Sequence, residues 1–474
     1  MQLLRYSNQM PLEFTPELKL GGGGEGVIYR VRGERSQSAK VYHKPSAEQG
    51  DKLLAMFKHP PDDPMQDIGH ASIAWPVDLL TSPETNEIVG FLMPFASDTF
   101  RAMDLFVPRS RLEKCPLFTY QYLHRTARNI AAAMDALHAS GVVVGDVNES
   151  NMLVTREALA TMVDTDSFQI RDSSGKLYRC GVGKPEFTPP ELQGFNLREV
   201  NRTPEHDRFG LAALIFQLLM EGAHPFSGQY HGEGDPPSIE SRIKEGEFPF
   251  GNASGSYSPP PNAPSFEILN PALRELFITC FQAGHVNPAK RPSASQWYVA
   301  LQAAESDLKK CRKNSQHRYG AHLKRCPWCE RAEKLGGRDY FPSRLALTTG
   351  AHLKKPALKQ TPLPAVAASS GRRTSHSYVK RSGSFSARVN DLLDRWDRSM
   401  ADTPARHVSF CAFAGALVLG AIRLASNRYL LSMHSWMKTI PAITAPGGLR
   451  FAVASLACGS FAALFAMYTW RRWN

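Results

Sequence analysis

The chain has 474 residues, of which 42% are hydrophobic, so it can bury at least one large core and is expected to form about two or three structural units. Its eight cysteines are too sparse for a disulfide framework and favour a reducing compartment. Lysine and arginine (56) outnumber aspartate and glutamate (44), and the net charge of +12 makes nucleic acid and anionic membranes candidate partners.

The N-terminal region lacks the features of a secretory signal. It reads "MQLLRYSNQMPLEF", without a basic region followed by an apolar run. We therefore expect the first residues to stay in the cytoplasm.

A glycine-rich stretch comes next and leads into a β-rich run. The stretch reads "LGGGGEGVIYRV" and contains G-x-G-x-x-G at Gly21, Gly23 and Gly26. Glycines let backbone N–H groups approach a polyphosphate, although four consecutive glycines are also typical of a flexible tether. Lys40 lies in the next β-rich run, "SAKVY", where a lysine is either an exposed surface residue or an anchor for phosphates.

A polar loop lies between two strand-like apolar runs in "GVVVGDVNESNMLV". It contains Asp146, Asn148, Glu149 and Asn151. Loops held by a rigid scaffold often carry catalytic groups, and a plain surface turn is the alternative.

Two aspartates, Asp164 and Asp166, follow the apolar run in "TMVDTDSFQI". Such a pair is compatible with a turn or with a Mg²⁺ site. Further along the chain are Glu191 in "GKPEFTPPEL", a buried helix predicted in "HDRFGLAALIFQLLMEGAHPF", and Arg291 in "AKRPSASQW". Each motif is ordinary by itself, and it is their order and intervals that carry information.

The motifs from Gly21 to Arg291 together resemble the eukaryotic-type protein kinase catalytic domain. The resemblance implies a bilobal α+β domain over residues 12–305. It also implies binding of ATP with Mg²⁺ or Mn²⁺, and transfer of the γ-phosphate to a serine or threonine hydroxyl of a protein substrate.

The same resemblance assigns the nucleotide-binding residues. Lys40 would contact phosphates and pair with an acid of the helix in "SAEQGDKLLAMF", either Glu48 or Asp51, with Glu48 preferred. The remaining nucleotide contacts would come from Gly21, Gly23, Gly26 and Ile28 above the nucleotide, Met93 near the gatekeeper position, and the backbone of Phe95 and Ala96 at the adenine.

The resemblance also assigns the catalytic residues. Asp146 would orient the substrate hydroxyl and accept its proton, and Asn151 and Asp166 would hold the metal, with Asp164 as a structural neighbour. It further implies that Asp207 anchors the helix beneath the catalytic loop and that Glu191 pairs with Arg291.

Several residues depart from the kinase pattern. Val144 and Gly145 replace the His-Arg pair before the catalytic aspartate, so no neighbouring arginine is available to receive a phosphorylated activation loop. Ser167 replaces the Phe of D-F-G, and Asn148 replaces the usual catalytic lysine. We predict an active kinase, and the alternative is a nucleotide-binding pseudokinase that acts as a scaffold.

Lys184 in "GKPEF" stands where serine/threonine kinases usually have a threonine facing the catalytic aspartate. Since Asn148 lacks the usual positive charge, we hypothesise that Lys184 reaches toward Asp146 and stabilises charge on the transferring phosphate. The alternative is an ordinary loop lysine that points to solvent.

Among kinases, the loops "GDVNESNMLV", "DTDSF" and "TPPEL" resemble those of a bacterial subgroup, the helix-hairpin-helix-associated or YegI-like kinases. By analogy with that group, the partners would include a PP2C-type phosphatase and a von Willebrand A domain protein. This is a family analogy about partners.

A cysteine/histidine module is predicted over residues 306–333, from "CRKNSQHRYGAHLKRCPWCER". The C-x2-C pair Cys326 and Cys329 could share a structural Zn²⁺ with Cys311 and His317. His322 could replace His317, and the site could also consist of buried free thiols. A thioredoxin-like redox pair is disfavoured because no βαβ pattern surrounds it.

The remaining chain is predicted to be a basic disordered linker (334–406) and a membrane hairpin (407–474) with spans at about 408–425 and 451–470. A single span with an interfacial helix and a buried soluble hairpin are the alternatives. The two apolar segments predict a multi-pass membrane protein. The kinase resemblance implies the bacterial inner (cytoplasmic) membrane, with the kinase domain in the cytoplasm because it needs ATP. The linker holds most of the positive charge but lacks regularly spaced aromatics, which favours anionic membrane lipids over nucleic acid.

Overall fold

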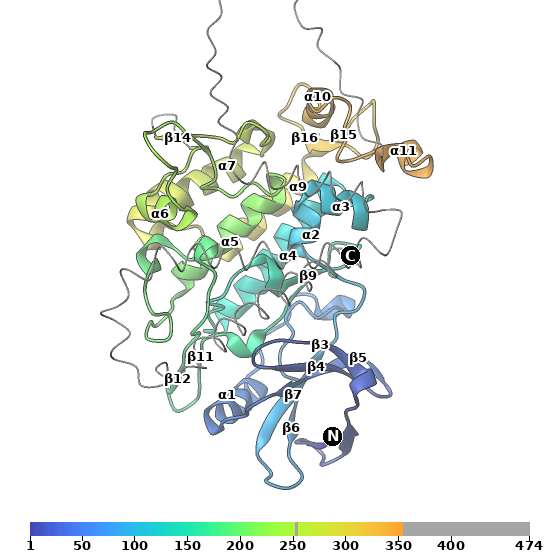
Figure 1. Cartoon of the computed structure of the whole chain (residues 1–474), viewed down its shortest axis with the longest axis vertical. Coiled ribbons are helices and arrows are strands. Elements are labelled where there is room, and N and C mark those ends of the chain that lie inside the picture. Colours follow the sequence, from blue (N-terminus) through green and yellow to red (C-terminus); the bar gives the residue numbers. More distant parts are fainter. Residues whose placement is uncertain (252–254, 354–474) are drawn as a thin grey trace, which may run out of the picture. The chain divides into compact units, whose positions relative to one another are not determined.

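The computed structural model describes residues 1–251 and 255–353, which lie in one compact unit. In Figure 1 a small β-rich lobe is followed by a larger, mainly helical lobe. Within the described residues, no helix has both the length and the apolar character needed to cross a membrane. The two expected spans, 408–425 and 451–470, and most of the expected linker lie outside the described residues.

The small lobe is built on a seven-stranded antiparallel sheet with the order β2-β1-β6-β7-β5-β4-β3. Leu4 of β1 pairs with Thr81 of β6, so this lobe begins before the predicted boundary at residue 12. The strands are β1 (Gln2–Arg5), β2 (Pro11–Glu13), β3 (Lys19–Gly22), β4 (Gly26–Val31), β5 (Glu34–Tyr42), β6 (Asp78–Thr81) and β7 (Ile88–Pro94).

Alternation along β5 decides which side chains face the rest of the unit. Ala39 and Val41 join a small core on one side of the sheet. Because successive strand residues point to opposite faces, Lys40 and Tyr42 point to the other side, and Tyr42 belongs to the main core. The strand therefore places Lys40 toward the turn that carries the two aspartates.

Helix α1 (Ala47–Lys58) covers this side of the sheet. Its first turn is closed by a capping box between Ser46 and Gln49. It buries Gly50, Leu53 and Met56, which recur at the spacing of one helix face.

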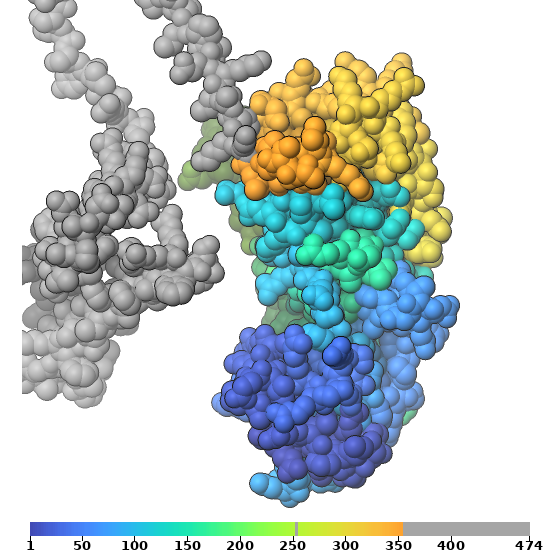
Figure 2. Space-filling model, turned by 90° about the vertical axis from the view of Figure 1, so that its right-hand side faces the viewer, coloured from blue at the N-terminus to red at the C-terminus, as the bar shows by residue number. Residues whose placement is uncertain are grey.

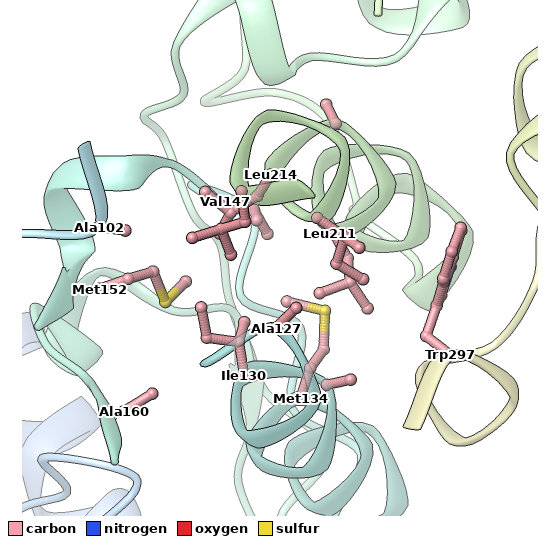
Figure 3. Packing of buried hydrophobic residues seen from close by; sticks show 14 of the residues in the cluster. Ala102, Ala127, Ile130, Met134, Val147, Met152, Ala160, Leu211, Leu214 and Trp297 are labelled. Atoms are coloured by element: carbon pink, nitrogen blue, oxygen red, sulfur yellow. The ribbon is translucent and has the colours of Figure 1, made fainter. Parts of the chain in front are cut away.

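The core of the large lobe lies between three long helices, α4 (Tyr120–Ala139), α5 (Pro204–Leu219) and α9 (Ala294–Ser306). In Figure 3, Val147, which belongs to the polar loop after α4, lies beside Leu214 of α5, and Trp297 of α9 lies farther away in the same cluster. A Cβ at Gly210 of α5 would lie 2.9 Å from the Val147 Cβ, so glycine is required there for the loop to dock. The polar loop is thus anchored in the core by its apolar residue.

Short elements complete the large lobe. A three-stranded sheet of order β10-β9-β8 supports the polar loop, and three two-stranded ribbons lie elsewhere. The strands are β8 (Phe100–Arg101), β9 (Met152–Val154), β10 (Ala160–Met162), β11 (Ile170–Arg171), β12 (Leu177–Tyr178), β13 (Gln229–Tyr230), β14 (Tyr257–Ser258), β15 (Leu308–Lys310) and β16 (Arg318–Gly320). The helices are α2 (Ala102–Phe106), α3 (Pro108–Lys114), α6 (Ile239–Glu245), α7 (Pro271–Ile278), α8 (Gly284–Val286), α10 (Pro327–Lys334) and α11 (Arg344–Thr348).

The predicted ion pair between Glu191 and Arg291 is confirmed. The two Arg291 Nη atoms each lie 2.7 Å from a Glu191 carboxylate oxygen, and the guanidinium is fully buried. Burial alone would raise the pKa of Glu191, but the hydrogen bonds and charge of Arg291 outweigh burial and lower it. The pair joins the segment after the two aspartates to the end of the helical lobe.

The cysteine/histidine module packs on the large lobe and extends past its predicted end at residue 333. The Trp328 ring of α10 lies 4.7 Å from Tyr120 of α4 and 4.8 Å from Phe341, measured between ring centroids. Phe341 is buried, and the Arg111 guanidinium of α3 stacks on it. Figure 2 shows this C-terminal part, in orange, lying against the cyan segment that contains α2 and α3.

Candidate active site

Asp207 fixes the backbone at the start of the polar loop. Its carboxylate accepts hydrogen bonds from the backbone N–H groups of Val144 (2.7 Å) and Gly145 (2.8 Å), and His138 Nε2 lies 3.0 Å away. Asp207 is buried in α5. This confirms the anchoring role that the sequence predicted for it.

Asp146 presents a carboxylate oxygen that lacks a partner. Its Oδ1 atom is buried without a hydrogen bond among the described residues, while Oδ2 accepts one from Asn151 Nδ2 at 3.2 Å. Burial raises the pKa of the Asp146 carboxyl, and hydrogen bonds from Asn148 and Asn151 offset part of that increase. A buried acceptor of this kind suits a proton donor brought in by a ligand.

Asn148 maintains the shape of the loop. Its side chain donates to the Asp146 carbonyl (3.2 Å) and accepts from the Ser150 N–H (2.9 Å), and it is almost completely buried. The residue at the usual lysine position therefore points into its own loop.

Lys184 reaches the polar loop, but its partners differ from the expected one. Its Nζ atom lies 2.7 Å from Glu149 Oε1 and 3.1 Å from Ser150 Oγ. The hypothesis placed this ammonium at Asp146, whereas Glu149 is the acid that binds it. Glu149 is therefore the carboxylate of the loop that forms the ion pair with Lys184.

Lys40 forms a buried ion cluster with both aspartates. Its Nζ atom lies 2.7 Å from Asp164 Oδ1 and 2.7 Å from the Asp166 carboxylate, and Glu25 is 3.8 Å away. Burial alone would lower the pKa of Lys40, but the charges of Asp166 and Asp164 outweigh burial and raise it.

The expected ion pair between Lys40 and an acid of α1 is not formed among the described residues. Glu48 and Asp51 are both exposed, and Asp51 lies 3.7 Å from Lys176 instead. The nearer aspartates, Asp164 and Asp166, already neutralise Lys40.

The two aspartates occupy different environments. Asp166 is 8% exposed, and its carboxylate binds Lys40 and accepts a 2.8 Å hydrogen bond from the Tyr42 hydroxyl. Asp164 has a left-handed backbone (φ 62°, ψ 34°) and a side chain 41% exposed. The preceding Val163 N–H bonds to the Asn151 carbonyl at 3.0 Å, so Asp164 lies beside the polar loop.

This geometry favours Asp164 over the expected Asp166 as the metal ligand. Both aspartates contact Lys40, but Asp166 also accepts a hydrogen bond from Tyr42 and is buried, whereas Asp164 contacts Lys40 through Oδ1 and has a side chain 41% exposed. The left-handed backbone of Asp164 changes the direction of the chain, so the side chains on either side of it point in different directions. A carboxylate and an amide oxygen side by side suit a hard cation, so Asp164 and Asn151 fit Mg²⁺ best.

The glycine-rich turn contains glycines of two kinds. A Cβ at Gly26 would lie 2.4 Å from the Val41 carbonyl oxygen, so packing against β5 requires glycine there. Added Cβ atoms at Gly21 and Gly23 would meet nothing within 4 Å, which leaves their surface open to a ligand. Ile28 pairs with Lys40 across β4 and β5, next to this turn.

The backbone of Phe95 and Ala96, after β7, was expected to contact the adenine, and one of the two N–H groups is free to do so. The Phe95 N–H donates to the Ser36 carbonyl (2.8 Å), and the Phe95 carbonyl accepts from Ser97. Within the described ranges, no acceptor is paired with the Ala96 N–H. Met93 is buried at the end of β7, so the expected gatekeeper position faces the core.

Arg202 was not predicted from the sequence, because "NRTPEHD" gives no signal for it. The buried guanidinium donates to the carbonyls of Gly145 (2.9 Å) and Val182 (3.1 Å). The Arg202 backbone and the Gln169 side chain exchange two 2.8 Å hydrogen bonds. An arginine from elsewhere in the sequence thus joins the polar loop to the segment before Lys184 without any phosphate group.

The predicted convergence of Cys311, His317, Cys326 and Cys329 is confirmed, because one ligand atom from each lies within 4.8 Å of all the others. His317 Nδ1 lies 3.4 Å from Cys326 Sγ and 3.5 Å from Cys329 Sγ. Asp339, which lies outside the predicted module, binds His317 Nε2 at 2.9 Å.

The alternative ligand His322 faces away from this cluster. Its Nε2 atom contacts the Glu267 carbonyl at 3.1 Å instead. His317 is therefore the histidine of the site.

Comparison with known proteins gives a consistent family. Residues 14–300 match the protein kinase domain family. The chain is 34% identical over 318 residues to protein kinase YegI of Escherichia coli O157:H7, covering 66% of this chain and 48% of that protein. The K12 strain protein gives 34% over 314 residues with the same coverage, and human ribosomal protein S6 kinase alpha-2 gives 25% over 254 residues, covering 51% and 32%. The chain spans about half the length of the YegI proteins.

The Arg202 contacts predict how the polar loop is held. Arg202→Met should remove both carbonyl contacts, so the backbone amides at 145–147 and 180–184 should exchange with solvent about 10-fold faster or more. Hydrogen-exchange mass spectrometry measures this, with the exposed Arg171→Met as the control. Unchanged protection at both segments in a folded Arg202→Met variant would contradict the role assigned to Arg202.

Proposed function

This chain belongs to the protein kinase family, and on that premise we propose that it transfers the γ-phosphate of ATP to a serine or threonine hydroxyl of a protein. The observation that carries the proposal is the buried, unpartnered Asp146 oxygen in a loop fixed by Asp207. Such an acceptor is what a catalytic base for a hydroxyl requires. Lys40, Asn151 and Asp164 supply the polar groups of a phosphate and metal site beside it.

In this proposal each residue of the site has a separate role. Asp146 orients the hydroxyl and accepts its proton, and its raised pKa makes the carboxylate a better proton acceptor. Lys40 binds phosphate oxygens, and the Ala96 N–H is available to the base. Asn151 uses its amide N–H groups for Asp146, which leaves its oxygen for a metal together with Asp164. Mg²⁺ or Mn²⁺, when bound with ATP, neutralises charge on the phosphates.

A second candidate function is nucleotide binding without transfer, as in a pseudokinase scaffold. It is favoured by one observation: Asn148, at the usual lysine position, points into its own loop, and Lys184 binds Glu149 instead of Asp146. The two functions differ only in whether phosphate is transferred.

The purified chain with labelled ATP, Mg²⁺ and a generic protein substrate tests the proposal. We expect labelled phosphoserine or phosphothreonine, and a loss of about 100- to 10,000-fold in Asp146→Asn, with nucleotide affinity retained. The exposed Asp62→Asn is the control. Nucleotide binding without any transfer by the wild-type chain would instead favour the scaffold.

Lys184 can be tested together with its partner. If Lys184 stabilises charge in the transition state, Lys184→Met should lower kcat by about 10- to 1000-fold, whereas Glu149→Gln, which releases the lysine, should retain or raise kcat. If Lys184 only anchors the loop, the two variants should lose similar activity. Equal losses would therefore refute a catalytic role for Lys184.

The cysteine/histidine cluster is proposed to hold one structural Zn²⁺. All four ligand positions are protein atoms, and Asp339 orients His317 so that Nδ1 faces the thiols. We expect one Zn²⁺ per chain by elemental analysis, lost in Cys326→Ser and Cys329→Ser but kept in His322→Gln. Loss of metal should also make residues 308–341 sensitive to protease. A metal-free wild-type chain with an ordered module would contradict this.

We also propose that segments 408–425 and 451–470 anchor the chain in a bacterial inner membrane, with the kinase domain in the cytoplasm where ATP is available. Anionic lipids beside the basic linker, a PP2C-type phosphatase and a von Willebrand A domain protein are the proposed partners, the last two by family analogy. A topology reporter fused after Asn474 tests the two-span arrangement, which requires a cytoplasmic signal.

A further inference from the structure

We propose that Asp166 is the positioning acid for Lys40, the role that the sequence assigned to an acid of α1. This inference rests on the proposed function, because it concerns the same nucleotide site. It divides the two aspartates by role: Asp166, which contacts Lys40 through both carboxylate oxygens, holds the lysine, and Asp164, which contacts it through Oδ1 alone, takes the metal.

The contacts of Asp166 are those of a fixed counter-charge. Its carboxylate binds Lys40 at 2.7 Å and receives the Tyr42 hydroxyl at 2.8 Å, and all three side chains are buried. A buried ion pair is retained only with good geometry and satisfied oxygens, and both conditions are met here. Lys40 and Tyr42 lie on the same face of β5, so one strand supplies both donors.

The charges on α1 are reversed relative to the expected arrangement. The residue of α1 that reaches this site is Lys52, whose Nζ atom donates to the Asp166 carbonyl at 2.6 Å. Burial lowers the pKa of Lys52, and the charge of Asp166 opposes that decrease. Two lysines thus converge on Asp166, where an acid on α1 would repel the carboxylate.

A cavity of about 420 Å³ lies beside Asp166 and is lined in part by residues of α1. Its lining includes Glu48, Lys52, Asp166, Tyr178, Val182 and Arg198. Glu48 stands at this cavity one helical turn before Lys52 and has no ion pair with Lys40. The acid expected on α1 therefore faces open space instead of the lysine.

The turn that carries Asp166 is itself fixed. The Thr165 hydroxyl donates to the Ala74 carbonyl at 2.8 Å, and the Ser167 hydroxyl donates to the Asp164 carbonyl at 2.8 Å. The position of Lys40 thus depends on this turn, and a displacement of α1 does not by itself remove its counter-charge. Among the described residues, no acid of α1 pairs with Lys40, so a movement of α1 would not control Lys40 through such an ion pair.

The experiment uses the full chain and separates metal binding from lysine positioning. The affinity for a non-hydrolysable ATP analogue is measured with and without Mg²⁺. Asp164→Asn should abolish the increase in affinity that Mg²⁺ gives, whereas Asp166→Asn should keep it. Loss of the Mg²⁺ effect in Asp166→Asn but not in Asp164→Asn would overturn the division of roles.

A charge exchange then tests the positioning role directly. Asp166→Asn should lower kcat by about 100-fold, because Lys40 loses its fixed position, and should lower the unfolding temperature, because buried Lys40 and half-buried Lys52 lose a counter-charge. Adding Lys52→Glu to Asp166→Asn restores an acid from α1 and should recover part of both losses, although Lys52→Glu alone is harmful. Additive losses in the double variant would overturn the proposal.

The α1 acids provide the matched comparison. Glu48→Gln and Asp51→Asn should keep kcat and the unfolding temperature near those of the wild type, and a loss as large as that of Asp166→Asn would return the role to α1. If the wild-type chain transfers no phosphate, the proposed function fails, but the Mg²⁺ effect and the recovery of unfolding temperature still decide the roles of the two aspartates.

Discussion

The buried contact between Lys40 and the two aspartates is the interaction on which the site depends. It joins strand β5 of the small lobe to the turn after β10, at distances of 2.7 Å. Because a buried lysine without a counter-charge is strongly unfavourable, the strand and the turn must be brought together for either to be stable. The cluster therefore sets where the phosphates of a nucleotide meet the loop of Asp146, and it makes the small lobe part of the site.

Buried polar contacts hold the other half of the site in the same way. Asp207 fixes the backbone of the polar loop, Val147 anchors it in the core, and Arg202 ties it to the segment before Lys184. Asp207 and Arg202 act through backbone atoms and Val147 through apolar packing, and together they fix the shape of the loop. Asp146 Oδ1 is a buried acceptor without a hydrogen-bond partner among the described residues, and this oxygen is where the chemistry is expected.

The sequence predicted what is encoded in ordered motifs and could not predict what depends on local turns and distant contacts. The resemblance of the ordered motifs to those of protein kinases implied the fold and the Glu191–Arg291 pair, and the ligand spacing predicted the cysteine/histidine cluster. Asp164 and Asp166 are two residues apart in a short motif and both contact Lys40. The motif does not show that Asp166 also binds Tyr42, or that Asp164 has a left-handed backbone and a side chain 41% exposed. Lys52, Arg202 and Asp339 act through partners far away in the sequence, and no short motif marks such contacts.

The most direct test of this account is an experimental structure of the chain with Mg²⁺ and a non-hydrolysable ATP analogue. The account predicts a metal ion held by Asp164 and Asn151, with Lys40 at a phosphate and still within hydrogen-bond distance of Asp166. A metal ion on Asp166, with Lys40 paired to Glu48 or Asp51 of α1, would contradict it.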